Sequence, residues 1–322
     1  MKINFTSLRD PETGDVLTLS GEALQSKFGT KYQIQRGVPR FVDPINYSKD
    51  FGDQWNMFPK TQLDSFTGSS ISESRLKRCL KINLEDLKGN LILEAGSGAG
   101  RFTEILLKYG SIVHSFDYSS AVDANFLNNG SHENLTLVQA DIRKIPFPKK
   151  SYDYVICLGV LQHTPSPEES IKSLWQMVRP GGILVIDHYE WQWRTVLPFG
   201  GSRAPFTRQL VLLLPRKYRF KFIKKLTDFW FPLQWKFKDS SLIRRLLIKF
   251  SPVAFHYPYV KLLNRNAYYE WALLDTHDAT TDYYQHLRTS KQIKSFLESL
   301  NAIEVVVTRA GNGVEAFCKK PI

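Results

Sequence analysis

Hydrophobic runs alternate with amphipathic stretches between residues 91 and 189, and this alternation predicts the organisation of the centre of the chain. Residues 91–96, LILEAG, form an apolar run without polar alternation, which is typical of a parallel strand buried on both faces. Residues 101–110, RFTEILLKYG, place their apolar side chains on one helical face and end at a glycine. Strand and helix in this order predict an α/β fold with a doubly wound parallel sheet and right-handed crossovers.

The same pattern continues to the end of this region. Further strands are predicted at 111–119, 134–142, 152–159 and 183–189. A helix is expected to open at Ser119 or Ser120, and Ser166, with Pro167 and Glu169 behind it, predicts a capping-box start for the next helix. The segment RPGG is expected to end that helix and to lead into the strand that follows.

The two ends of the chain differ from its centre. Near the C-terminus, a helix over 290–300 precedes two strands around an Asn-Gly pair, which predicts an antiparallel hairpin. Near the N-terminus, short strands and turns precede a helical stretch at 70–82. The predicted regions are a β-rich module at 1–45, a helical lid or linker at 46–90, a sheet core at 91–189, a helical insertion at 190–265, and the C-terminal part of the core at 266–322.

Composition narrows the class of protein. The chain has 322 residues, of which 43% are hydrophobic, so it is long enough to bury a substantial core. Its three cysteines, Cys79, Cys157 and Cys318, are too few and too scattered for a disulfide framework or a cysteine-rich zinc site, so no metal is expected. The longest apolar runs are too short to cross a bilayer, and no apolar leader segment is visible. We therefore expect a cytoplasmic protein.

Charge is concentrated in one window of the chain. Residues 201–265 contain 15 Lys and Arg against two Asp, so 15 − 2 gives +13, while the whole chain carries +12. The remainder is therefore close to neutral. Such a shift marks a separate functional surface or subdomain.

Chemistry-bearing residues gather where the predicted strands end. In a doubly wound sheet, ligands bind beyond the carboxyl ends of the strands. Glu94 beside a glycine loop would repel a pyrophosphate but suits an ammonium and a sulfonium group. Asp117 is placed to bind a ribose diol, and Asp141 to accept from an adenine amine with Ile142 against the ring. The candidate ligand-binding positions are Glu94, Gly96, Ser97, Gly98, Gly100, Asp117, Tyr118, Asp141, Ile142, Cys157, Leu158 and Gly159.

Five motifs together resemble a known family. LILEAGSGAGRF, SFDYSS, VQADIRKIPF, YDYVICLGVLQHT and VRPGGILVI are similar, in order and spacing, to the motifs of class I S-adenosylmethionine-dependent methyltransferases of the type 11 group. The resemblance implies a Rossmann-like seven-stranded sheet and S-adenosyl-L-methionine as cofactor. It also implies that Glu94 and the loop glycines line the methionine part, that Asp117 holds the ribose, that Asp141 and Ile142 meet the adenine, and that residues 157–159 back the cofactor. Residues 1–45 resemble a zinc-ribbon-like module of the Trm112 type without its zinc ligands.

Candidate catalytic and acceptor residues lie around the same strand ends. A hydroxyl acceptor needs a base near neutral pH, and His163 and then His188 are best placed, although His163 could equally shape its loop. Tyr189, Asp278 and Tyr284 are candidates for the acceptor pocket or for solvated loops. Trp55 and Gln62 either close over the cofactor or pack within a lid. The segment CLGVLQ replaces the Asn/Asp-Pro-Pro-aromatic loop of DNA amino-methyltransferases, which favours a small-molecule, glycan or lipid-linked acceptor.

The basic insertion allows three interpretations. It could be a cap whose apolar faces pack on the catalytic domain, a peripheral contact with an anionic membrane through residues 201–265, or a nucleic-acid surface, which ranks last. The membrane interpretation would place the protein on the inner face of the membrane. The leading hypothesis is thus a methyltransferase directed at oxygen. The alternatives are a cofactor-binding protein without catalysis and an RNA-directed methyltransferase.

Overall fold

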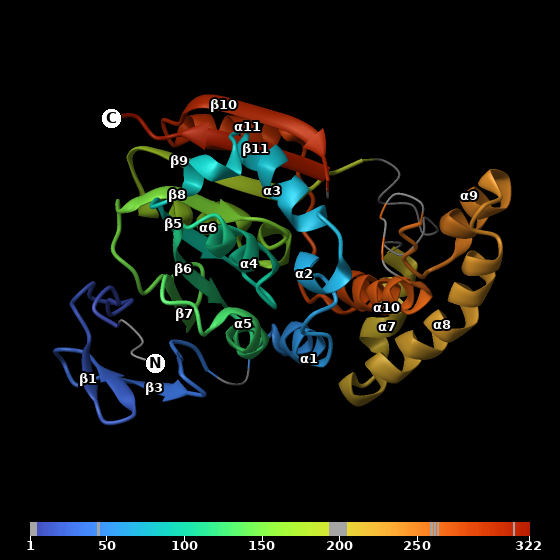
Figure 1. Ribbon diagram of the computed structural model, residues 1–322, viewed down its shortest axis with the longest axis horizontal. Coiled ribbons are helices and arrows are strands. Elements are labelled where there is room, and N and C mark those ends of the chain that lie inside the picture. The colour runs from blue at the N-terminus through green and yellow to red at the C-terminus, as the bar shows by residue number, and fades with distance from the viewer. Residues whose placement is uncertain are drawn as a thin grey trace. The chain divides into compact units, whose positions relative to one another are not determined.

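The computed structural model of the protein describes residues 5–43, 46–192, 205–257, 260, 262, 264–311 and 313–322. The chain divides into two compact units (Figure 1). The first comprises residues 1–59, 72–190 and 284–322, and the second comprises residues 60–71 and 191–283.

A seven-stranded sheet forms the centre of the first unit. In sheet order its strands are β10 (Ile303–Ala310), β11 (Gly313–Lys319), β9 (Val178–Tyr189), β8 (Tyr152–Cys157), β5 (Leu91–Ala95), β6 (Ile112–Asp117) and β7 (Leu135–Gln139). Strands β5 to β9 pair in parallel, whereas β11 is antiparallel to both β9 and β10. The predicted doubly wound sheet with a terminal antiparallel hairpin is confirmed. The Asn-Gly turn itself rests on Asn312, which lies outside the described residues.

Helices cover both faces of this sheet. They are α3 (Ile71–Leu80), α4 (Arg101–Lys108), α5 (Val122–Asn129), α6 (Pro167–Met177) and α11 (Ser290–Ser299), with 3₁₀ turns at Leu84–Leu87 and Leu161–His163. Leu174 of α6 and Leu297 of α11 pack in one buried core, while Leu76 of α3 and Leu106 of α4 pack in another. The sheet is therefore buried on both sides, which explains its apolar strands.

Two local predictions need correction. Helix α5 begins at Val122, after the predicted Ser119 or Ser120, because Ser119 bonds backward to Asp117 and its hydroxyl accepts from Ala121 N at 3.1 Å. The segment RPGG does not separate helix from strand, since β9 already begins at Val178, which pairs with Tyr152. At the cap of α6, Ser166 Oγ accepts from Glu169 N at 3.4 Å, which is the Ser166 half of the predicted capping box.

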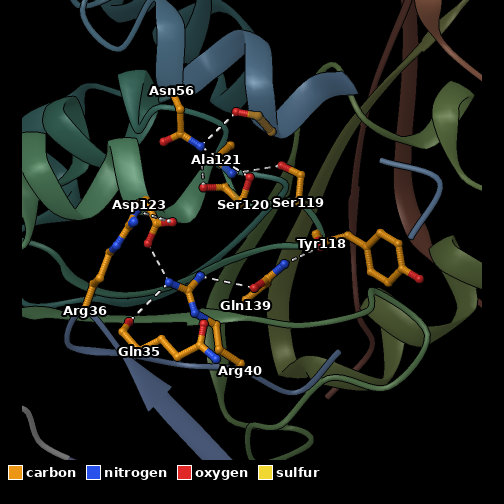
Figure 2. A network of polar contacts seen from close by, with 11 residues as sticks. Gln35, Arg36, Arg40, Asn56, Tyr118, Ser119, Ser120, Ala121, Asp123 and Gln139 are labelled. Carbon is orange, nitrogen blue, oxygen red and sulfur yellow. Dashed lines mark hydrogen bonds and ion pairs between the residues drawn. The ribbon is translucent and has the colours of Figure 1, made fainter. Parts of the chain in front are cut away.

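The N-terminal strands form a small antiparallel sheet of their own. Its strands are β1 (Thr18–Ser20), β2 (Ala23–Gln25), β3 (Lys31–Gln35) and β4 (Val38–Pro39). Residues just after β4 continue onto the edge of the large sheet, where Phe41 N donates to Gln139 O at 2.8 Å. Arg40 binds the Gln139 side chain and Asp123 of α5 (Figure 2). This β-rich module is thus part of the first unit, and its likeness to the Trm112 type stays a prediction.

The second unit is helical. Its helices are α2 (Asp64–Thr67), α7 (Pro205–Leu213), α8 (Arg216–Lys236), α9 (Ser241–Phe250) and α10 (Arg265–Thr281). Phe231 of α8 packs with Val253 and with Tyr268 and Ala272 of α10. This packing draws the chain up to residue 283 into the second unit, beyond the boundary at 265 that the sequence suggested. None of the described helices is long and apolar enough to cross a membrane.

Candidate functional site

The glycine-rich loop after β5 has a backbone that side chains would not tolerate. Gly96, Gly98 and Gly100 adopt positive φ angles of 75°, 55° and 90°. A Cβ on Gly96 would lie 2.1 Å from Val160 Cγ2, and one on Gly98 would lie 3.3 Å from the Trp55 ring. The loop thus runs close beneath Trp55, which comes from α1 (Lys49–Met57).

Glu94, at the end of β5, is a buried carboxylate with spare hydrogen-bonding capacity. Its Oε2 accepts from Thr103 Oγ1 at 2.5 Å and from Ser115 Oγ at 2.9 Å, while Oε1 has no partner within the described residues. Burial raises the pKa of Glu94 to about 7, although the two hydroxyl donors act in the opposite direction. A buried carboxylate oxygen without a partner suits a cationic group.

Asp117, at the end of β6, supports the glycine loop. Its Oδ2 accepts from Gly98 N at 2.9 Å, and its Oδ1 accepts from Ser119 N at 2.8 Å and Ser119 Oγ at 2.7 Å. Burial raises the pKa of Asp117, and these donors lower it. Because an ionised carboxylate offers about four lone-pair sites, Asp117 retains capacity for one further donor. Beside the loop, the buried Ser97 hydroxyl has no partner among the described residues.

Asp141, two residues beyond the end of β7, is held by a residue that the sequence analysis missed. Arg143 donates from Nε to Asp141 Oδ1 at 3.1 Å and from Nη2 to Oδ2 at 2.7 Å. This contact raises the pKa of the Arg143 guanidinium. A bidentate Arg on an acid two residues earlier leaves fewer free lone pairs, so any role of Asp141 toward an adenine amine would be shared with Arg143. Ile142 is buried beside it.

Aromatic side chains surround this end of the sheet. Tyr118 stacks on Tyr47 with ring centroids 4.9 Å apart, and Tyr47 meets Tyr284 edge-on at 5.2 Å. Burial raises the pKa of the Tyr47 hydroxyl, so Tyr47 is neutral. Tyr284 thus joins the cluster from the far end of the chain.

The loop after β8 is positioned by an acid on the neighbouring strand. Gly159 N donates to Asp187 Oδ1 at 2.5 Å, and Arg75 forms an ion pair with Asp187. Cys157 and Leu158 are buried in front of this glycine, and burial raises the pKa of the Cys157 thiol well above its usual range. Asp187 was missed, although its place near the end of β9 is the signal that identified the other acids.

His163 lies at the centre of several contacts. Its Nδ1 is 3.2 Å from Tyr284 O, and its ring meets Phe51 of α1 at 5.2 Å and Tyr189 at 5.3 Å. Phe51 and Trp55 are one turn apart on α1, so the same helix contacts both the His163 ring and the glycine loop. Trp55 thus lies beside the glycine loop, and its closing over the cofactor stays a prediction.

His188 has a different environment. It is buried in β9, its Nδ1 is 3.0 Å from Tyr189 O, and burial lowers its pKa to about 4. Its Nε2 has no hydrogen-bond partner among the described residues. The next residue on the same face, Ile186, belongs to the apolar core. Both histidines are buried, but His163 contacts α1, the helix that also lies against the glycine loop, and this placement favours His163 over His188 as the candidate base.

The remaining candidates belong to the second unit. Asp278 lies on α10, and Gln62 donates from Nε2 to Asp275 Oδ1 at 3.2 Å. The contact with Asp275 gives Gln62 a partner inside the second unit. Over the described part of the chain, no group of His, Cys, Asp and Glu side chains is arranged to hold a metal ion.

Comparison with known proteins identifies the part of the chain that carries these strand ends. Residues 93–186 match the family described as a methyltransferase domain. The centre of the chain is a methyltransferase domain. This match confirms, for that domain, the resemblance to class I S-adenosylmethionine-dependent methyltransferases.

The alignments with individual relatives cover only part of each relative's length. A ubiquinone biosynthesis O-methyltransferase of Coxiella burnetii is 31% identical over 100 residues, which are 30% of this chain and 43% of that protein. An uncharacterized chloroplastic methyltransferase of Arabidopsis thaliana is 32% identical over 117 residues, covering 33% of this chain and 32% of that one. Among solved structures, a SAM-dependent methyltransferase from Aquifex aeolicus has a TM-score of 0.42 and 12% identity, with 83% of this chain and 97% of that chain covered. The chain thus spans less than half the length of these two curated relatives.

Proposed function

We propose that the protein is an S-adenosylmethionine-dependent methyltransferase that methylates an oxygen atom of a small-molecule, glycan or lipid-linked acceptor. The observation that carries this proposal is the buried Glu94 Oε1, which has no partner among the described residues and lies beside a glycine loop inside a matched methyltransferase domain. The name of the Coxiella burnetii relative, an O-methyltransferase, supports oxygen as the methylated atom.

The residues present fit the cofactor. Glu94 and the 96–100 loop would hold its cationic amino-acid end, since a ligand ammonium group satisfies a buried carboxylate oxygen. Asp117 would accept from the ribose, and Ile142 with the Asp141–Arg143 pair would border the adenine. When bound, S-adenosylmethionine supplies a methyl group on a sulfonium, which is a good leaving group.

The chain's own contribution is positioning, exclusion of water and removal of a proton. Phe51 and Trp55 of α1 shield the loop and His163 from solvent. With Nδ1–H donated to Tyr284 O, His163 keeps Nε2 as its basic nitrogen, and this atom would take the proton of an acceptor hydroxyl. Orienting the acceptor toward the methyl group supplies much of the remaining rate, at best about 7 to 11 kcal/mol of the barrier.

Calorimetric titration with S-adenosylmethionine tests the cofactor half of the proposal. Asp117→Ala removes an acceptor for the ribose and the partner of Gly98 N, so we expect affinity to fall about 10- to 100-fold. Asp153→Ala is the matched control, because Asp153 holds Leu91 N at 2.8 Å near the other end of β5 and should leave affinity within about twofold of wild type. Unchanged affinity in Asp117→Ala would refute the assigned site.

A further inference from the structure

Helix α9 of the second unit exposes an apolar face. Leu242, Leu246 and Phe250 are spaced four residues apart and therefore share one side of the helix, where Leu242 is 69% and Phe250 is 63% exposed. No residue of α9 is buried. On the opposite side, Ile248 packs toward the core around Phe231, and Arg244 donates to Lys238 O. The exposed face is thus not the face that holds the helix in place.

Helix α8 carries a similar stripe. Phe222, Phe229 and Leu233 lie on one side of the helix, and all three are exposed, Phe229 by 63%. The opposite side is buried through Ile223, Thr227, Phe231 and Gln234. Both helices therefore have a side that faces their own unit and a second apolar side that is exposed. Exposed apolar faces of this extent mark interaction sites.

Basic side chains border both stripes. Lys221, Lys225 and Lys236 on α8, and Arg245 and Lys249 on α9, are exposed. In the described part of the chain, none of these five forms an ion pair with a carboxylate. Across residues 205–257, twelve Lys and Arg against two Asp give 12 − 2, or +10. The two Asp are already occupied, because Asp228 pairs with Lys224 at 2.8 Å and Asp239 with Lys238 at 2.5 Å.

We propose that the exposed faces of α8 and α9 form a docking surface for an anionic lipid bilayer. Aliphatic and aromatic side chains in the middle of a face, with lysine and arginine along its border, match an interface in which the apolar stripe enters the acyl boundary and the cations meet lipid phosphates. The proposal rests on the second unit alone and does not depend on the proposed methyl transfer.

Charge and side-chain type favour this occupant over two others. A second copy of the chain would bring like-charged borders together, and the +10 of this segment has no acidic counterpart within it. A nucleic acid would use aromatic platforms on which bases stack, whereas half of the six stripe residues are leucines, namely Leu233, Leu242 and Leu246. Aliphatic side chains gain free energy from entering hydrocarbon, not from bases.

Sedimentation with vesicles tests the surface on the full-length protein. We expect binding to phosphatidylcholine vesicles that contain phosphatidylglycerol, weakening as salt rises, and little binding to phosphatidylcholine alone. Arg245→Gln combined with Lys249→Gln removes two border charges and should weaken binding about 30-fold. Lys224→Gln combined with Lys238→Gln removes the same net charge from paired positions, and should weaken binding less than about threefold.

The apolar part of the surface has its own test. Leu246→Gln combined with Phe250→Gln should weaken binding about tenfold or more at low and high salt alike. Leu213→Gln, at an exposed position on α7 outside the proposed surface, is the control and should bind as wild type does. Circular dichroism checks that each variant is folded.

Three results would overturn the proposal. One is the absence of vesicle binding at both salt concentrations. Another is an equal loss in the paired-lysine control and in the border variant. The third is a dimer, or a complex with single-stranded RNA, that Leu246→Gln with Phe250→Gln abolishes while vesicle binding is unaffected.

Discussion

The two units of the protein use polar side chains in opposite ways. In the first unit, the acids at the strand ends point into the fold, where Glu94, Asp117 and Asp187 bind hydroxyls and backbone amides. On α8 and α9 of the second unit, charged side chains such as Lys224 and Asp228 are exposed beside apolar ones that are also exposed. Enclosed acids suit a small ligand held in one orientation, whereas an open basic and apolar face suits an extended partner. The comparison therefore supports the two proposals, in which the first unit carries the chemistry and the second unit the attachment.

If chemistry is confined to the first unit, replacing the proposed base should have the largest effect on the rate of methyl transfer. His163→Asn should lower the rate of methyl transfer by about 10²- to 10⁴-fold, because a positioned general base contributes that much. Affinity for S-adenosylmethionine should stay within about twofold of wild type, since Asn preserves a polar side chain of moderate size. Release of S-adenosylhomocysteine with metabolite and lipid extracts as acceptors measures the rate.

The docking surface supplies the matched control. Leu246→Gln combined with Phe250→Gln changes only the second unit, so its rate with a water-soluble acceptor should equal that of wild type. An equal loss of rate in this variant would break the division of roles. Cofactor binding without turnover in the wild-type protein, over all extracts, would instead indicate a binding protein without catalysis.

The buried Glu94 predicts a pH dependence of both stability and binding. Its folded-state pKa is raised from 4.5 to about 7, so the folded protein binds this proton more tightly than the unfolded chain. The stability that this group contributes is present in full below about pH 4.5 and is lost as pH rises through about 7. Glu94→Gln removes this loss, so its free energy of unfolding should exceed that of wild type above about pH 7, by roughly 3 kcal/mol at most.

Affinity for the cofactor should depend on pH in the opposite direction, and should be higher at high pH. The carboxylate attracts a cationic ligand only when ionised, so wild-type affinity for S-adenosylmethionine should fall as pH falls through about 7, and Glu94→Gln should bind weakly at every pH. Chemical denaturation and titration over a pH series measure the two effects. Glu133→Gln, at an exposed position, is the control. A wild-type affinity that does not change with pH would argue against Glu94 as a ligand of the cation.

Much of the first unit was predictable because its signals are local. A parallel strand buried on both faces is mainly apolar, and an acid near its carboxyl end stands out from it, so Glu94, Asp117 and Asp141 could be located from sequence. Arg143 and Thr103 were not found, because their role depends on side-chain contacts with Asp141 and Glu94 that the sequence does not show. Asp187 shows the remaining error, since the rule that identified the other acids was not applied to its strand.

The second unit was less predictable because its boundaries depend on packing between distant segments. The periodicity of α8 and α9 identified the helices, but could not show which of two apolar sides would be buried. Residues 60–71 join this unit through contacts such as Gln62 with Asp275, and residues 266–283 through contacts such as Tyr268 with Phe231. The sequence therefore left open whether the insertion is a cap, a membrane surface or a nucleic-acid site, and the exposed sides of α8 and α9 support the membrane surface that we propose.

Two ion pairs, one in each unit, allow a direct test of the difference between the units, with the smallest expected effect. Arg40 and Asp123 are 9% and 14% exposed in the first unit, and Arg40 also binds Gln139 (Figure 2). Lys224 and Asp228 are 50% and 47% exposed in the second. Arg40→Met should lower the free energy of unfolding by about 1 to 3 kcal/mol, because Asp123 then lies largely buried with only the exposed Arg36 beside it. Lys224→Met should leave it close to that of wild type, since solvent screens an exposed pair. Urea denaturation measures both. Equal losses would mean that the second unit needs its exposed ion pairs for folding. Its basic side chains could then not be attributed to partner binding alone.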